Sequence, residues 1–71
     1  MRKIGITCDD WKKPHFERAL DVAELKDREV FQLPHKVTLI RVNIEDNEFL
    51  EKQEQIRRLC VRLEHNLKRS N

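Results

Sequence analysis

The chain of 71 residues is long enough for one small domain, and domains of this size bury only about 60% of their unfolded surface. Charged residues (39%) are as frequent as apolar residues (38%), so the core must be small and the surface heavily ionised. The 15 basic and 13 acidic side chains nearly cancel to a formal net charge of +2. This balance excludes the bulk basic excess of a strongly cationic nucleic-acid-binding protein. Any electrostatic role must therefore come from local patterning of charge.

The cysteine content favours a reducing compartment. Cys8 and Cys60 are too few for the disulfide framework that stabilises most small secreted domains. Both fall on apolar patterns, where a free cysteine behaves as a small hydrophobic residue. No apolar run is long enough for a signal peptide or a membrane span. We therefore expect a cytoplasmic protein with one domain over residues 1–71, two reduced core thiols and no cofactor.

A strand and a helix are predicted in the first part of the chain. Residues 3–8 alternate between apolar and polar or small side chains, which is typical of a half-buried strand. Pro14 suits the first turn of a helix, where its missing N–H is not needed. From there, apolar residues recur at three- and four-residue spacing and predict a helix from Pro14 to about Lys26.

A second, short strand is predicted over residues 29–33. Phe31 and Leu33 point to one side of it, and Val30 and Gln32 point to the other. We expect Phe31 to lie on the core face. Val30 and Gln32 are then expected on the opposite face.

The segment 36–44 (KVTLIRVNI) is the best strand candidate, because it is rich in β-branched residues and contains no Gly or Pro. Pro34 and His35 form a hairpin-length connection to it from the preceding strand. The face that we assign to the core carries Thr38, Ile40, Val42 and Ile44.

The longest predicted element is a helix over residues 45–69. A continuous apolar stripe runs along it at helical spacing. The stripe consists of Phe49, Leu50, Ile56, Leu59, Cys60, Leu63 and Leu67.

The element order β-α-β-β-α predicts a mixed α+β fold. A right-handed crossover connects the first two strands, and the third strand inserts antiparallel between them. The result is a two-layer sandwich with a three-stranded sheet of order 1-3-2 and both helices on one face. This topology resembles a ferredoxin-like fold that lacks its last strand, and that fold hosts many functions. It leaves the strand over 3–8 at an open sheet edge, where another strand can pair by dimerisation or peptide addition.

The sheet face opposite the helices is one candidate for protein binding. Three aliphatic side chains there would form an apolar patch that a partner can cover, although small domains routinely expose such residues. The residues of this candidate surface are Val30, Val37, Leu39 and Arg41.

Trp11 is a second candidate contact, because it lies in a connection beside Lys12 and Lys13. An exposed tryptophan can anchor a protein contact or stack on a base. The alternative, which we favour, is that Trp11 closes one end of the small core.

Basic residues of the C-terminal helix suggest a second kind of partner. The helix is acidic in its first half and basic in its second, which complements the helix dipole and accounts for most of the pattern. The basic stripe can also follow a nucleic-acid backbone, in which case binding weakens steeply with salt. The residues of this alternative site are Lys12, Lys13, Arg57, Arg58, Arg62 and Arg69.

Asp9 and Asp10 follow the first predicted strand. Two adjacent carboxylates can hold Mg²⁺, which prefers hard oxygen ligands. An acidic residue after the first strand of a ferredoxin-like domain is similar to the arrangement in the CRISPR-associated Cas2 proteins, and this resemblance implies a metal-dependent nuclease. Adjacent aspartates between a strand and a helix also form turns and caps, which is the interpretation we favour.

No catalytic constellation is evident elsewhere. The three histidines lie in separate predicted elements, and no close Cys or His pair has the spacing of a zinc site. Gly5 is the only glycine, which argues against a phosphate-binding loop, and no nucleophile–base motif is present. We therefore expect no enzymatic activity. The favoured hypothesis is a small protein-binding module, regulatory or inhibitory, that forms a homodimer, with nucleic-acid binding as the alternative.

Overall fold

The fold has the predicted element order. A computed structural model describes residues 1–69, with side chains up to Lys68. Two short 3-10 helices, η1 (Asp10–Lys12) and η2 (Asp46–Glu48), precede the two α-helices. The main elements are β1 (Arg2–Asp9), α1 (Lys13–Val22), β2 (Arg28–Leu33), β3 (Val37–Ile44) and α2 (Phe49–Arg69). The predicted mixed α+β class is therefore confirmed.

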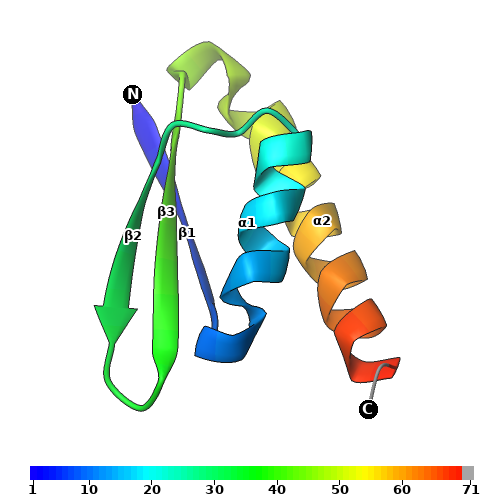
Figure 1. Cartoon of the computed structure of the whole chain (residues 1–71). Coiled ribbons are helices and arrows are strands. Elements are labelled where there is room, and N and C mark those ends of the chain that lie inside the picture. Colours follow the sequence, from blue (N-terminus) through cyan, green and yellow to red (C-terminus); the bar gives the residue numbers. More distant parts are fainter. Residues whose placement is uncertain (70–71) are drawn as a thin grey trace.

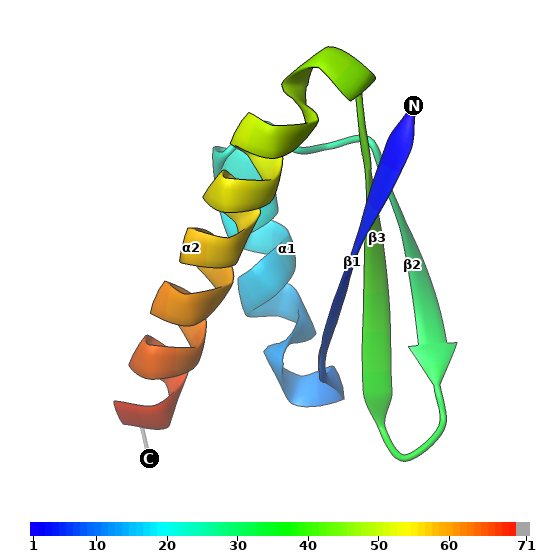
Figure 2. The same ribbon diagram turned by 180° about the vertical axis from the view of Figure 1, so that it is seen from behind.

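The three strands form one sheet in the order β1-β3-β2, with β3 antiparallel to both neighbours. Both α-helices lie on the same side of this sheet, and the other side faces away from them (Figures 1 and 2). The predicted sheet order is therefore confirmed, and β1 and β2 are its two edges. No helix described over residues 1–69 has an apolar stretch long enough to span a bilayer.

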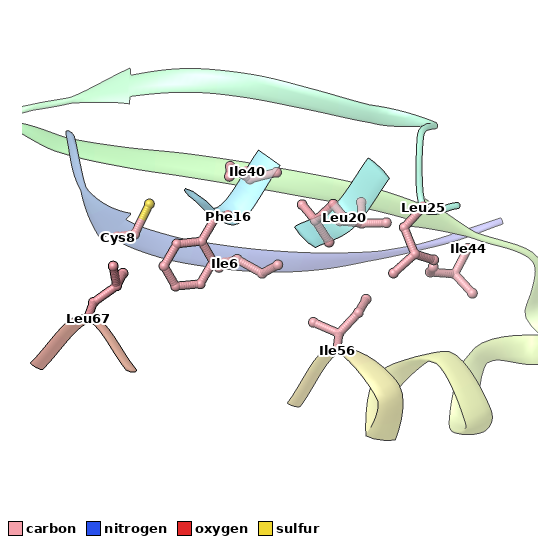
Figure 3. Packing of buried hydrophobic residues seen from close by; sticks show 10 residues of the cluster. Ile6, Cys8, Phe16, Leu20, Leu25, Ile40, Ile44, Ile56 and Leu67 are labelled. Atoms are coloured by element: carbon pink, nitrogen blue, oxygen red, sulfur yellow. The ribbon is translucent and has the colours of Figure 1, made fainter. Parts of the chain in front are cut away.

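The core lies between the sheet and the two helices (Figure 3). Alternate residues of β3 are buried, because successive side chains of a strand point to opposite faces. These are Thr38, Ile40, Val42 and Ile44, as predicted. Ile6 and Cys8 of β1 extend the same face, and Phe16, Leu20, Ile56 and Leu67 of the helices cover it.

Helix α1 ends at Val22, earlier than the predicted end near Lys26. Glu24 adopts a left-handed conformation with φ of 61°. The N–H of Leu25 donates to the carbonyl of Leu20 at 2.8 Å, which closes the helix end in the pattern usually completed by a glycine. Leu25 is thereby turned into the core. The absence of a glycine hid this boundary in the sequence.

Strand β2 presents the face opposite to the one predicted. Val30 is opposite Ile40, and Gln32 is opposite Thr38. Opposed residues of an antiparallel pair share a face, so Val30 and Gln32 lie on the helix side of the sheet. Phe31, expected in the core, lies on the outer side.

The connection between β2 and β3 explains this error. A two-residue link through Pro34 and His35 was predicted, but β3 begins at Val37 and the link has three residues, Pro34 to Lys36. Lengthening a hairpin connection by one residue shifts the pairing by one and exchanges the faces of the strand.

The beginning of α2 also differs from expectation. The first helical turn is the 3-10 helix η2, and α2 starts at Phe49. Leu50 was placed on the apolar stripe but is 79% exposed. The stripe of α2 therefore begins with Phe49 and continues with the buried Ile56.

Candidate functional site

The outer face of the sheet carries a strip of apolar side chains near the hairpin, which we call the outer strip. Odd-numbered residues of β2 and β3 share this face, because they lie opposite one another in the sheet register. Phe31 is 39% exposed, and the other members are partly buried. The strip consists of Phe31, Leu33, Val37 and Leu39. Both helices lie on the other side of the sheet (Figure 2).

Arg41 borders the outer strip. Its guanidinium carbon lies 5.0 Å from the centroid of the Phe31 ring, within the range of a cation–π contact. The sheet register places Arg41 between Gly5 and Glu29. Glu29 also lies near Lys3, with 3.6 Å between Oε1 and Nζ. At the charged end of the outer face, contacts between charged and aromatic side chains therefore connect all three strands.

Gly5 extends the strip toward β1. A Cβ atom at this position would lie 3.4 Å from Cδ1 of Leu39, so the leucine side chain rests against the glycine main chain. The apolar surface therefore crosses the sheet from β2 to β1.

The structure brings together three of the four residues predicted for this surface. Val37, Leu39 and Arg41 share the outer face, whereas Val30 lies on the helix side. Sequence reasoning missed Phe31 and Leu33, because it assumed the shorter hairpin connection. The sequence contains a signal that identifies these two residues. If Ile40 faces the core and three residues link the two strands, the antiparallel register places residues 31 and 33 on the outer face of the sheet.

Trp11 lies in η1 and is 53% exposed. It lines a shallow hollow of about 470 Å³ together with Asp9, Asp10, His35 and Lys36. Trp11 is therefore next to the β2–β3 turn and does not close the core. This position makes it a candidate contact residue at the hairpin end of the sheet.

Two of the three residues of that turn have an uncommon backbone conformation. His35 and Lys36 have φ values of 65° and 60°. Apart from Gly, the residues enriched in this left-handed region are Asn, Asp and His, so Lys36 is the less suited of the two. The main chain there is also tied to η1, because the N–H of Asp10 donates to the carbonyl of Lys36 at 2.9 Å.

The Asp10 carboxylate connects η1 to the sheet. It accepts a hydrogen bond from Oγ1 of the buried Thr38 at 2.6 Å. Nε2 of Gln32 donates to the same carboxylate, at 3.1 Å and 3.0 Å from its two oxygens. These contacts give Asp10 a structural role. They join it to the sheet and do not cap η1, whose N-cap residue Asp9 makes no side-chain capping hydrogen bond.

Asp9 behaves differently, since its side chain is 59% exposed and its closest cation is Lys12 at 3.9 Å. Among the described residues, no group of three or more His, Cys, Asp or Glu side chains is arranged to hold a metal ion.

Lys12 connects η1 to α2. Its Nζ donates to Glu64 at 2.7 Å, and its side chain is only 15% exposed. The hydrogen bond to Glu64 raises the pKa of Lys12, although partial burial opposes it. Lys12 is therefore committed to an intramolecular contact and is poorly placed to bind nucleic acid.

The other basic residues of the nucleic-acid hypothesis are dispersed or paired. Arg57 and Arg58 both contact Glu54, at 2.6 Å and 3.2 Å, and the hydrogen bond from Arg57 is the main cause that lowers the pKa of Glu54. Lys13 and Arg62 show no carboxylate within 4.0 Å in the part of the chain that the structure describes. The side chain of Arg69 lies outside the described residues.

Cys8 and Cys60 are both free thiols, as expected. Burial raises the pKa of Cys8, and the Glu64 carboxylate adds to the shift. Burial also raises the pKa of Cys60, again with a smaller contribution from Glu64. A raised pKa lowers the thiolate fraction near neutral pH, so neither thiol has the environment of a reactive cysteine.

A groove of about 410 Å³ lies between the two helices. Its apolar lining comes from α1, from Ala23 directly after it and from α2, and the charged side chains that line it are arginines. The residues around it are His15, Arg18, Ala19, Val22, Ala23, Gln55, Leu59, Arg62 and Leu63. Arg62 therefore lines this groove with α1 residues, and it also lines a neighbouring hollow on α2 together with Arg58.

Comparisons with protein-family models, with curated proteins and with solved structures found no match to this chain.

Proposed function

We propose that this chain is a protein-binding domain, regulatory or inhibitory in its action, that contacts its partner through the outer strip. The observation that carries the proposal is the uncovered apolar surface formed by Phe31, Leu33, Val37 and Leu39. Contiguous exposed apolar patches with a polar rim are typical of protein interaction sites.

The charges around the outer strip favour a particular kind of partner. Arg41 stacks on Phe31, and arginine and aromatic side chains are enriched at the centres of protein interfaces. Neither Arg41 nor Lys36 has a carboxylate within 4.0 Å among the described residues. The partner surface that fits is apolar at its centre and acidic at its rim.

A photo-crosslinking amino acid placed at Leu39 tests this proposal in nuclease-treated lysate of the source cells. Val61 is the control position, because it is 62% exposed but lies on α2, away from the strip. We expect a defined protein adduct from position 39 that position 61 does not give. Equal adducts from both positions, or none, would contradict the proposal.

Competition with unlabelled protein makes the assay specific. Excess wild-type protein and the Val30→Glu variant should both suppress the adduct, whereas Phe31→Glu should not. Val30 and Phe31 are adjacent and each is 39% exposed, but they lie on opposite faces of the sheet. Equal suppression by the two variants would show that the outer face is not the contact. An adduct that forms in untreated lysate but not in nuclease-treated lysate would instead indicate nucleic acid as the partner.

A further inference from the structure

Strand β1 has an unpaired edge whose free main-chain groups can be identified. The N–H of Asp10 donates to the carbonyl of Lys36, directly beyond the opposed pair Asp9 and Val37. Hydrogen-bonded and non-hydrogen-bonded pairs alternate along an antiparallel ladder. Even-numbered residues of β1 therefore bond to β3. The residues whose N–H and C=O groups point to the open edge are Lys3, Gly5, Thr7 and Asp9.

The side chains of these four residues do not block the edge. Gly5 and Thr7 are small. They lie between the basic Lys3 at one end of the strand and the acidic Asp9 at the other. The strand pairs with β3 over eight residues without interruption, so it has no bulge. Prolines, bulges and unpaired central charges are the usual protection of an edge strand, and β1 has none of them.

We propose that β1 pairs antiparallel with β1 of a second copy of this chain, with Ile6 of the two copies opposite one another. In this register Lys3 lies opposite Asp9 of the second copy, and Asp9 lies opposite its Lys3. Gly5 and Thr7 are likewise opposed. Every main-chain N–H and C=O group of these residues that points to the open edge is then hydrogen-bonded to the second copy. The two sheets join into one, with all helices on the same side.

Neighbouring registers lack this complementarity. A shift that moves the opposed residue by two places puts Lys3 opposite Thr7, or Asp9 opposite Gly5, and separates the charges. A shift by one place puts the helix side of one copy beside the outer side of the other. The chosen register also places the partly exposed Ile4 opposite Cys8 of the second copy, on the core side.

The edge of β2 does not offer an equivalent contact. It is shorter, with six residues against eight. Its opposite charges, Arg28 and Glu29, are adjacent in sequence and therefore on opposite faces, so they cannot face one another in a symmetric antiparallel pair. The inference goes beyond the contact proposed at the outer strip, and its test leaves the strip unchanged.

Charge reversal tests both the dimer and its register. Sedimentation equilibrium should show a wild-type dimer whose dissociation constant rises about tenfold in Lys3→Glu or in Asp9→Lys, because each change puts like charges opposite one another twice. An equimolar mixture of the two variants should recover wild-type affinity, since every opposed pair is again complementary. The double variant Lys3→Glu/Asp9→Lys should recover it as well.

Glu29→Lys is the matched control. It removes the contact of Lys3 with Glu29 within the chain but leaves the β1 edge unchanged, so its dissociation constant should stay close to the wild-type value. A monomeric wild-type protein at millimolar concentration would overturn the inference. So would a dimer whose variants do not recover affinity on mixing. Neither result affects the crosslinking test at Leu39, so failure here and failure of the proposed function can be told apart.

Discussion

At the scale of single residues, the two adjacent aspartates show how position decides the role of a carboxylate. Asp10 accepts hydrogen bonds from Thr38 and Gln32, while Asp9 is mostly exposed. The sequence predicted a turn role for the pair, with metal binding as the alternative. It did not indicate that Thr38, twenty-eight positions away, would depend on one of them.

Replacement of Asp10 by Ala should lower the free energy of unfolding by about 1–3 kcal/mol, because the buried Thr38 hydroxyl loses its acceptor. Asp9→Ala is the control and should change it by less than about 0.5 kcal/mol, as for most exposed positions. Urea unfolding followed by circular dichroism measures both. Equal losses, or a Mg²⁺-dependent stabilisation removed by either change, would contradict the structural role of Asp10.

At the scale of elements, the β2–β3 hairpin determines which residues form the outer strip. Its three-residue link contains two consecutive left-handed residues, His35 and Lys36, and lysine is not among the residue types that favour that conformation. Without this link Phe31 would face the core. The three-residue length of this turn is therefore responsible for the exposed surface that we propose to bind a partner.

The double variant His35→Asn/Lys36→Gly should raise the free energy of unfolding by about 1–2 kcal/mol, because Asn and Gly tolerate positive φ. His35→Ala/Lys36→Ala removes the same side chains but keeps a Cβ atom at both positions, and we expect no gain from it. Thermal unfolding distinguishes the two. A comparable gain in both variants would attribute the effect to side-chain chemistry rather than to backbone conformation.

At the scale of the whole molecule, the two thiols lie where the sheet meets α2. Cys8 is buried on β1, and Cys60 is partly buried on α2. Since burial raises both pKa values above the ordinary 9.0, the folded protein holds the thiols protonated at pH values where the unfolded chain has begun to ionise.

The free energy of unfolding should therefore fall as pH rises above 9.0, until the folded-state pKa values are passed. Urea titrations between pH 7.5 and 10.5, under reducing conditions, compare the wild type with Cys8→Ala/Cys60→Ala. The variant is less stable at neutral pH, but its stability should fall less over this interval. Lys12 is present in both proteins, and Cys8 is the smallest of the causes that raise its pKa, so its own titration differs little between them. Parallel curves would contradict the prediction.

The fold class can be read from the sequence, because the period of the apolar residues specifies strands and helices locally. Alternation along β1 and β3 and the helical spacing of α1 and α2 predicted the elements, the sheet order and the core face of β3. The open edge of β1 followed from the topology alone. These features depend on contacts within an element or on chain connectivity.

The residues that form the candidate surface are set by contacts between segments of the chain and not by local sequence patterns. The length of the turn after Leu33 set the register of β2, and that register moved Val30 inside and Phe31 outside. The left-handed residue Glu24, which follows the end of α1 at Val22, and the contact of Lys12 with Glu64 were likewise not evident from the sequence. The register of β2 and the contact of Lys12 with Glu64 join segments whose pairing no local pattern specifies. The end of α1 depends on a left-handed backbone conformation that glutamate does not favour.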